Sequence, residues 1–334
     1  MTETITKKLT RKDFQSDQEV RWCPGCGDYA ILAAVQKYMA DTGTDPANTV
    51  FVSGIGCSSR FPYYMNTYGF HTIHGRAPAV ATGVKTANPE LDVWLVTGDG
   101  DALSIGGNHL AHILRRNLDV NILLFNNEIY GLTKGQYSPT SPVGTRKKST
   151  PMGSIDRPFN PISFALGANA TFAARTIDVD AKHMASIFAA AAAHKGTSFI
   201  EIMQNCVIFN KDFYNDTVSK PVRADMTVTL TPGEKVLYGK DKDKGLKITK
   251  DGVVKCSADE ADVWDPTNDS AGAAFAYSYL DSQPDMPQPL GVFRAVESTI
   301  YEEGVNAQVA DAIAKKGAGE LKDLVYAGER WKIG

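Results

Sequence analysis

Apolar runs rich in β-branched residues alternate with segments of helical periodicity between residues 28 and 206, and this alternation restricts the fold more than any other feature of the chain. The strand-like runs lie at residues 49–53, 93–97, 120–125, 171–176 and 198–203. The helical segments lie at residues 28–40, 77–85, 108–116 and 180–194. Such alternation builds a parallel sheet covered by helices on both faces. We therefore expect an α/β fold, a doubly wound and mostly parallel sheet, with ligands bound at the carboxyl ends of its strands.

The composition is that of a soluble globular protein. The 334 residues are 43% hydrophobic and 22% charged, and 35 basic against 38 acidic side chains give a net charge of -3. This balance argues against nucleic acid as a partner, and the absence of an 18-residue apolar run argues against a membrane span. A polar N-terminal segment and only five cysteines argue against secretion and a disulfide scaffold. We expect a cytoplasmic protein.

The character of the sequence changes near residue 210. Residues 246–255 include an Asp-Gly pair that predicts a hairpin, and residues 305–316 predict an amphipathic helix. We divide the chain into a domain at residues 1–210 and a C-terminal extension at residues 211–334. The extension is polar, so we expect it to pack on the core or on a partner subunit.

Four cysteines lie at positions where they can converge. Cys23 and Cys26 form a Cys-Pro-Gly-Cys turn, whereas Cys57 and Cys206 each follow a predicted strand. A Cys-x-x-Cys pair alone is compatible with zinc, a redox dithiol or an iron–sulfur cluster. Cys57 and Cys206 are candidates for the third and fourth ligands, and the alternative is that they are small buried hydrophobic residues.

A second group of polar residues follows two neighbouring strands. Gly98, Asp99, Gly100 and Asp101 lie between a buried strand and a helix, where backbone amides can hold a diphosphate. Asn127 lies 28 residues after Asp99, at the end of the next strand. Carboxylate and amide oxygens suit Mg²⁺, so we expect a diphosphate and magnesium site here.

The segment from Gly98 to Asn127 resembles the thiamine-diphosphate motif. Together with the Cys-Pro-Gly-Cys turn, the Ile-Gly-Cys at residues 55–57 and the His-Gly-Arg at residues 74–76, it resembles the β subunit of 2-oxoacid:ferredoxin oxidoreductases. The resemblance extends over roughly residues 20–215. It implies the thiamine-diphosphate-binding type of doubly wound sheet.

The resemblance also implies the residues that bind each cofactor. Mg²⁺ would be held by Asp99, Asn127 and the carbonyl of Ile129, and a [4Fe–4S] cluster by Cys23, Cys26, Cys57 and Cys206. Contacts to thiamine diphosphate would come from Ile55, Gly56, Cys57, Ser58, His74, Gly98, Gly100, Asp101, Gly131 and Leu132.

The activity implied is the coenzyme A-dependent oxidative decarboxylation of a 2-oxoacid, with electrons passed through the cluster to ferredoxin. We assign no catalytic residue on this chain, because the activating glutamate is expected on an α subunit or a fused γ–α subunit. Arg60 and Lys134 are the cations nearest the motifs. If they bind a second substrate carboxylate, 2-oxoglutarate, converted to succinyl-CoA and CO₂, is favoured over pyruvate or a branched 2-oxoacid. Otherwise they are surface charges or subunit contacts.

Two other functions were weighed against this one. A self-contained thiamine decarboxylase or synthase carries both a pyrimidine and a diphosphate domain, and this chain has room for one. A non-redox scaffold subunit stabilised by zinc would use the same four thiolates, and the cysteine pattern alone leaves that alternative open.

Overall fold

The structure is a computed structural model that describes residues 8–283 and 285–334. Its strands are β1 (Thr49–Ser53), β2 (Tyr68–His71), β3 (Asp92–Gly98), β4 (Asn121–Asn126), β5 (Ile129–Tyr130), β6 (Gln136–Tyr137), β7 (Phe172–Ile177), β8 (Ser198–Met203), β9 (Thr227–Leu230), β10 (Leu237–Tyr238), β11 (Lys244–Thr249), β12 (Gly252–Ser257) and β13 (Gln288–Ala295). Its α-helices are α1 (Asp28–Thr42), α2 (Phe61–Tyr64), α3 (Ala77–Ala87), α4 (Asp99–Leu103), α5 (Gly107–Arg116), α6 (Pro161–Gly167), α7 (Ala181–Ala193), α8 (Asn215–Val218), α9 (Arg223–Met226), α10 (Gly272–Ser278), α11 (Tyr301–Lys316) and α12 (Leu321–Val325).

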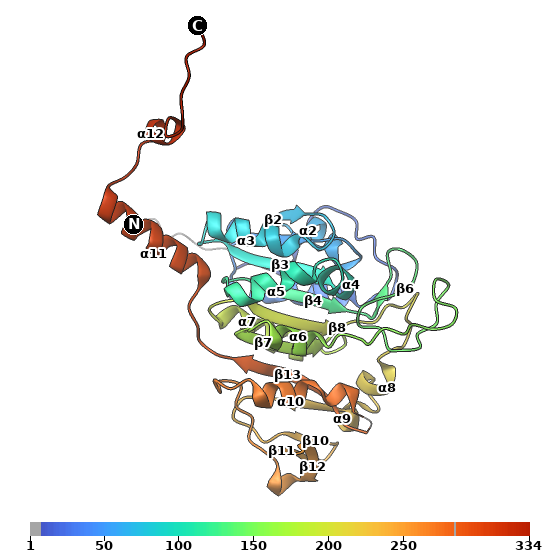
Figure 1. Cartoon of the computed structure of the whole chain (residues 1–334). Helices are drawn as coiled ribbons and strands as arrows, with labels where there is room; N and C mark the ends of the chain where they lie inside the picture. Colours follow the sequence, from blue (N-terminus) through green and yellow to red (C-terminus); the bar gives the residue numbers. More distant parts are fainter. Residues whose placement is uncertain (1–7, 284) are drawn as a thin grey trace.

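An eight-stranded sheet forms the centre of the molecule (Figure 1). Its strand order is β2-β1-β3-β4-β8-β7-β13-β9. Neighbouring strands are parallel except β7 and β13, which are antiparallel. The five predicted strands and four predicted helices are all present, with small shifts at their ends. The predicted α/β, mostly parallel sheet is confirmed.

Helices cover both faces of this sheet because its central strands are apolar on both sides. In β4, Ile122 and Leu124 pack in a cluster with α3, α5 and α6, whereas Leu123 and Phe125 pack in a second cluster with α1 and α7. Consecutive strand residues point to opposite faces, so a continuous apolar run fills both clusters. All the strand ends that carry the predicted motifs therefore meet at one edge of a rigid sheet.

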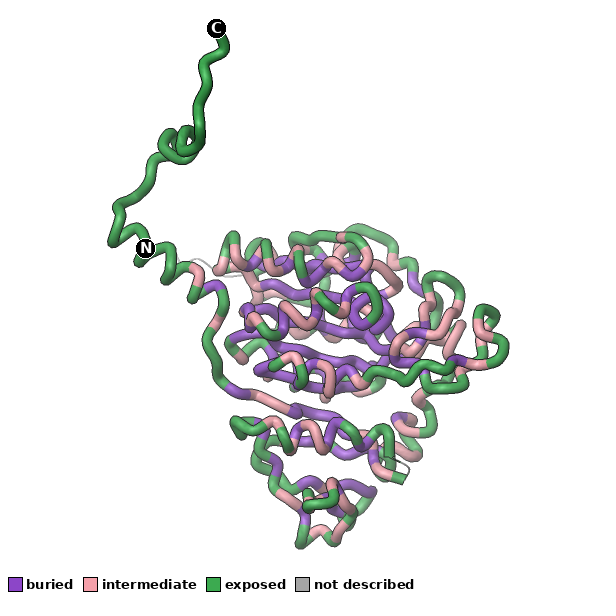
Figure 2. Tube along the Cα trace, in the orientation of Figure 1, coloured by how far each residue is buried: buried purple, intermediate pink, exposed green. Residues whose placement is uncertain are grey.

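The extension contributes to the same sheet and core. Strands β9 and β13 complete the sheet at the edge beyond β7, and Val228, Trp264 and Phe293 belong to the cluster that also contains α5. The Trp264 indole donates a hydrogen bond to the Val292 carbonyl at 2.6 Å. Figure 2 shows buried chain running on from the central strands into β13.

The end of the chain leaves the body as an arm. The helix predicted at residues 305–316 is present in α11, but the expected apolar packing face is not: within α11 only Glu302 is buried, and Val309 and Ile313 are about half exposed. Figures 1 and 2 show α11 and α12 extending away from the sheet. Among the described residues, no helix is both long and apolar enough to cross a bilayer.

Candidate cofactor site

A narrow cavity of about 70 Å³ lies at the carboxyl ends of β1, β3 and β4. It is lined by all thirteen residues predicted to contact thiamine diphosphate or Mg²⁺, together with three others: Ile55, Gly56, Cys57, Ser58, His74, Gly98, Asp99, Gly100, Asp101, Phe125, Asn127, Ile129, Tyr130, Gly131, Leu132 and Thr133. A wider cavity of about 710 Å³ adjoins it, because His74, Tyr130 and Thr133 line both. The structure thus brings together residues from Ile55 to Thr133, which lie 78 positions apart in the chain.

Asp99 is the first residue of α4 and is buried, with 2% of its surface exposed. The Thr140 hydroxyl lies 2.7 Å from its Oδ2. Burial raises the pKa of the Asp99 carboxyl to about 6, and within the described residues no cationic side chain forms an ion pair with it. A buried carboxylate without a cationic partner is unfavourable, and a bound cation would relieve that cost.

Asn127 and Ile129 supply the remaining predicted oxygen ligands. Asn127 follows β4, and its Oδ1 accepts a hydrogen bond from the Ile129 amide at 3.3 Å. Both residues line the cavity that also contains Asp99. One carboxylate, one amide and one carbonyl oxygen are the hard ligands that Mg²⁺ takes. The donor set therefore fits the predicted ion.

The first turn of α4 is closely covered by Tyr130. A Cβ atom added at Gly100 would lie 2.2 Å from the Tyr130 ring, and the Tyr130 hydroxyl donates a hydrogen bond to the Gly100 carbonyl at 3.1 Å. Any side chain at position 100 would displace this ring. The glycine of the motif is thus required for packing as well as for an open approach to the backbone.

Asp101 connects three strand-end turns. Its carboxylate accepts hydrogen bonds from the Ile55 amide at 3.1 Å, the Gly75 amide at 2.7 Å and the Thr97 hydroxyl at 2.8 Å, and it contacts Nδ1 of His74. Asp101 is predicted as a cofactor contact. In the structure its oxygens are occupied by protein groups, so its evident task is to hold the 54–56 turn and the His74 ring in place.

The four predicted cluster cysteines gather beside this cavity. Cys23 and Cys26 form a turn before α1, closed by a 3.0 Å hydrogen bond from the Cys26 amide to the Cys23 carbonyl. A Cβ atom at Gly131 would lie 3.7 Å from the Cys57 sulfur and 3.6 Å from the Cys206 sulfur. Gly131 therefore lies between two of the thiols while also lining the cofactor cavity.

The thiols are electrostatically coupled. Burial raises the pKa of Cys57 to about 12, with contributions from the nearby charges of Asp28, Cys206 and Cys23. Burial and Asp28 likewise raise the pKa of Cys26 above its ordinary value. These raised pKa values favour the thiol form of Cys26 and Cys57 unless a positive centre is bound. In the described part of the chain, no group of three or more His, Cys, Asp or Glu side chains is arranged to hold a metal ion.

The two predicted substrate cations lie in different surroundings. Arg60 lines a cavity of about 450 Å³ that also includes Ile55, Gly56 and Leu132 of the narrow cavity. Lys134 is exposed, has a left-handed backbone with φ of 75°, and lines none of these three cavities. Arg60 is thus the better placed of the two for a carboxylate beside the cofactor.

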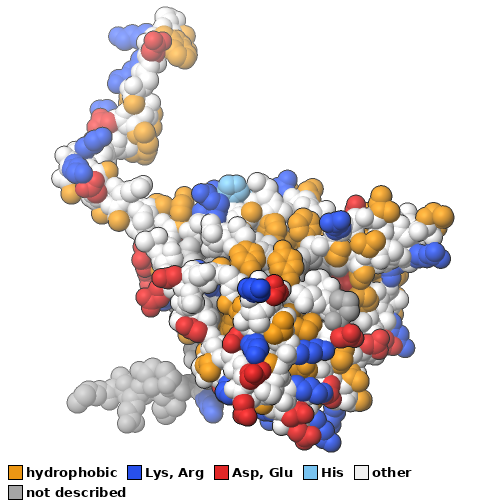
Figure 3. Space-filling view, turned by 60° about the horizontal axis from the view of Figure 1, so that its bottom comes forward, with side chains coloured by type: hydrophobic (Ala, Val, Ile, Leu, Met, Phe, Trp, Pro, Cys, Tyr) orange, Lys and Arg blue, Asp and Glu red, His pale blue; other side chains and the backbone are white. Residues whose placement is uncertain are grey.

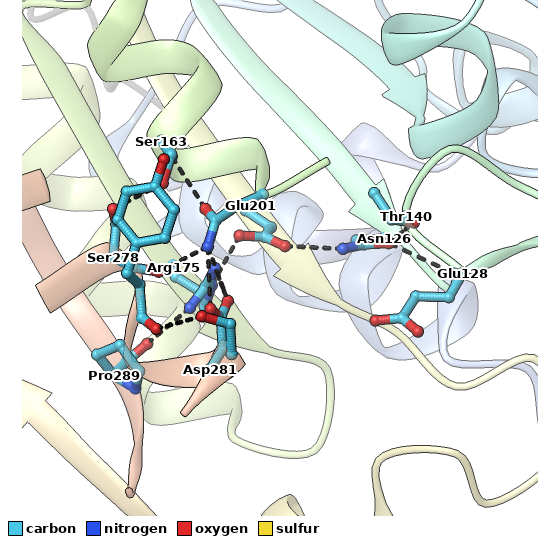
Figure 4. Close-up of polar contacts among 12 residues, drawn as sticks. Asn126, Glu128, Thr140, Ser163, Arg175, Glu201, Ser278, Asp281 and Pro289 are labelled. Carbon is cyan, nitrogen blue, oxygen red and sulfur yellow. Dashed lines mark hydrogen bonds and ion pairs between the residues drawn. The ribbon is translucent and has the colours of Figure 1, made fainter. Parts of the chain in front are cut away.

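A network of hydrogen-bonded side chains lies behind the cavity, and it is not predicted from the sequence. The Thr140 hydroxyl lies 2.9 Å from Oδ1 of Asn126, whose amide nitrogen donates to Glu201 at 2.8 Å. Glu201 pairs with Arg175 at 2.7 Å, and Arg175 pairs with Asp281 of the extension at 3.1 Å. Figure 4 shows these side chains in line from the end of β4 to the extension.

The sequence contains a signal for this hydrogen-bonded network, but it does not show which residues pair with each other. Arg175 and Glu201 are charged residues inside otherwise apolar predicted strands, and both are buried. A buried charge requires a partner, yet only the strand order shows that β7 and β8 are neighbours. Thr140 lies in the irregular segment between β6 and α6, where no periodic pattern indicates its position.

Known proteins resemble this chain over most of its length. The family described as "Thiamine pyrophosphate enzyme, C-terminal TPP binding domain" matches residues 54–202. The chain is 50% identical over 331 residues to 2-oxoglutarate oxidoreductase subunit KorB of Mycobacterium tuberculosis, covering 96% of this chain and 88% of that protein. It is 50% identical over 203 residues to 2-oxoacid:ferredoxin oxidoreductase 1, subunit beta, of Aeropyrum pernix, covering 60% of this chain and 64% of that protein.

A solved structure also matches the whole fold. A chain of the 2-oxoglutarate:ferredoxin oxidoreductase from Magnetococcus marinus, determined with 2-oxoglutarate, coenzyme A and succinyl-CoA bound, aligns with a TM-score of 0.77 at 30% identity. The alignment covers 98% of both chains. The likeness therefore includes the extension and the arm.

Proposed function

Since this chain belongs to the β subunits of the 2-oxoacid:ferredoxin oxidoreductases, we propose that it binds thiamine diphosphate in an enzyme that oxidatively decarboxylates 2-oxoglutarate. The choice of substrate is supported by the names of the Mycobacterium tuberculosis relative and the Magnetococcus marinus structure. The reaction converts 2-oxoglutarate and coenzyme A to succinyl-CoA and CO₂, with release of two electrons and one proton.

The observation that carries the proposal is the composition of the narrow cavity. Its wall contains all thirteen residues that the resemblance assigns to thiamine diphosphate and Mg²⁺, and its oxygen donors fit Mg²⁺. In this proposal Asp99, Asn127 and the Ile129 carbonyl hold the ion, and the backbone of residues 98–101 faces the diphosphate. Asp101 orients His74 toward the same cavity. When bound, thiamine diphosphate supplies the electron sink that decarboxylation needs.

Electron transfer is assigned to the four cysteines. Cys23, Cys26, Cys57 and Cys206 would hold a [4Fe–4S] cluster, which moves one electron at a time. Two ferredoxin molecules, each taking one electron, then balance each turnover. Because Gly131 lines the cofactor cavity and a Cβ atom added to it would lie within 4 Å of two of the thiols, the two centres would be near neighbours.

A partner α subunit completes the enzyme in this proposal. It would supply the glutamate that activates the aminopyrimidine and much of the coenzyme A site, because the family match on this chain is to one thiamine-binding domain. We place the complex in the cytoplasm, where cysteines remain reduced.

The first test is the metal content of the anaerobically purified chain. About four irons and four acid-labile sulfides per chain are expected for one cubane cluster. One zinc and no sulfide would instead establish the scaffold alternative. The complex with its α subunit is then assayed with 2-oxoglutarate, pyruvate and a branched 2-oxoacid, and a preference for either of the last two would refute the substrate assignment.

Arg60 and Lys134 are tested as substrate cations in the same complex. We expect Arg60→Ala to lower kcat/KM for 2-oxoglutarate about tenfold more than for pyruvate, because it removes a bidentate carboxylate partner. Lys134→Ala should show the same preference with a smaller effect, since Lys134 is exposed. Equal losses for both substrates would remove the residue concerned from substrate selection.

A further inference from the structure

The segment between β5 and α6 carries a concentration of positive charge, of which the proposed chemistry uses Lys134 alone. Residues 134–157 contain five basic side chains and one acidic one, in a chain whose net charge is -3. Arg146, Lys148 and Arg157 are exposed. In the described residues, none of these three forms an ion pair with a carboxylate. Their charge is therefore available to a partner.

Large apolar side chains accompany these cations. Met152 is 90% exposed and Ile155 is 89% exposed, and Val143 is more than half exposed. Apolar residues exposed to this degree beside arginines are typical of a surface that binds another protein. Figure 1 shows this segment, which we call the basic loop (residues 134–157), projecting at the side where the carboxyl ends of the central strands lie.

The basic loop is attached to the thiol site at two points. The Lys147 ammonium donates a hydrogen bond to the Phe209 carbonyl at 2.9 Å, three residues after Cys206. A Cβ atom at Gly135 would lie 2.9 Å from the Phe209 ring. Gly131, just before the loop, lies between the Cys57 and Cys206 sulfurs. A protein bound on the loop would therefore be held beside the cysteines.

We infer that the basic loop is the docking surface for an acidic electron-carrier protein of the ferredoxin class. The inference rests on the proposed function, in which a cluster on the four cysteines is oxidised by one electron as the carrier's iron–sulfur centre is reduced by one. Unpaired cations attract an acidic partner over a distance comparable with the Debye length and raise its association rate. Met152 and Ile155 provide the apolar contact that fixes the bound position.

The test uses the assembled complex carrying Arg146→Glu and Lys148→Glu together. With an acidic bacterial-type [4Fe–4S] ferredoxin at low ionic strength, we expect KM for the carrier to rise at least tenfold and its dependence on salt to flatten. The rate with methyl viologen, a small acceptor that needs no docking surface, should equal that of the wild type. A charge-neutral pair, Arg146→Gln and Lys148→Gln, should give a smaller rise in KM.

A matched control lies at the far end of the molecule. Lys240 and Lys242 are exposed on the turn between β10 and β11, so Lys240→Glu with Lys242→Glu makes the same change in net charge. Figure 3 shows basic and acidic side chains intermixed over the lower part of its view, and ion pairs such as Lys244–Asp225 occur in the extension. This control should leave KM for ferredoxin unchanged.

The outcomes separate the docking inference from the proposed function. A wild-type complex that reduces neither acceptor with any 2-oxoacid refutes the function itself. Viologen reduction with an unchanged KM for ferredoxin in both loop variants overturns the docking inference alone. Loss of the α subunit from either loop variant, measured by gel filtration, also overturns it, because the loop would then be a subunit interface.

Discussion

Two buried polar groups lie at the same end of the central sheet and differ in how their charges are balanced. Around Asp99, the described residues offer a hydroxyl, an amide and carbonyls but no ion-pairing cation, and burial raises its pKa to about 6. Around Arg175, two carboxylates and the Pro289 carbonyl satisfy one guanidinium (Figure 4). The charges of the second group are balanced by side chains of this protein, whereas the Asp99 carboxylate has no cationic partner among the described residues. The difference marks one as structure and the other as a binding site.

The largest effect is expected when the balancing cation, Arg175, is removed from the second group. Arg175→Met should destabilise the fold by about 3–5 kcal/mol, because it leaves the buried Glu201 carboxylate without its counter-charge. Urea denaturation at neutral pH measures the loss. Adding Glu201→Gln should recover part of it. Wild-type stability in the single variant would mean that Arg175 balances neither carboxylate.

In the first group, removing the Asp99 carboxylate should strongly weaken ligand binding. Asp99→Asn removes the only carboxylate of the predicted Mg²⁺ set, so we expect at least about a 100-fold loss in Mg²⁺-dependent affinity for thiamine diphosphate, or about 2.7 kcal/mol. Calorimetric titration of the assembled complex measures the affinity. Iron and sulfide contents should not change. Unaltered cofactor affinity would exclude Asp99 as a ligand.

In the absence of metal, Asp99→Asn should stabilise the fold. The Asp99 pKa is raised from 3.8 to about 6, so its protonated form stabilises the fold and this contribution is lost as pH rises from about 4 through 6. At pH 7.5 in a chelator, Asp99→Asn should be more stable than the wild type by about 3 kcal/mol. The advantage should vanish at pH 4. An equal difference at both pH values would contradict the assignment of the effect to this carboxyl.

The smallest effect is expected where the two groups meet. The Thr140 hydroxyl has one proton and lies against both Asp99 and Asn126. Thr140→Val should weaken Mg²⁺ binding about fivefold by removing a hydrogen bond worth about 1 kcal/mol, whereas Thr140→Ser should restore it. If the serine variant is as weak as the valine variant, the methyl group rather than the hydroxyl positions Asp99.

The central strands could be predicted from the sequence, whereas β2 and β13 could not. β3, β4 and β8 are continuous apolar runs because both of their faces are buried. β2 is exposed along its whole length, and β13 contains Pro289 and Gly291, which weaken a strand pattern. These two strands are placed by tertiary contacts, which produce no local pattern in the sequence.

The same distinction holds at the site. Glycines and acids directly after predicted strands could be assigned to one edge because parallel topology brings strand ends together. The contact between Asp101 and His74, and that between Thr140 and Asp99, form only in the folded chain. No local sequence pattern predicts them.

The turn at residues 55–58 connects the cofactor cavity to the thiol site. Ile55, Gly56 and Ser58 line the cofactor cavity while Cys57, between them, contributes its sulfur to the thiol site, and the Trp22 indole holds its carbonyl at 2.7 Å. A single rigid turn cannot relax around one centre without moving the other. In the proposed enzyme, oxygen that destroys a cluster on the four cysteines should therefore also release the thiamine cofactor.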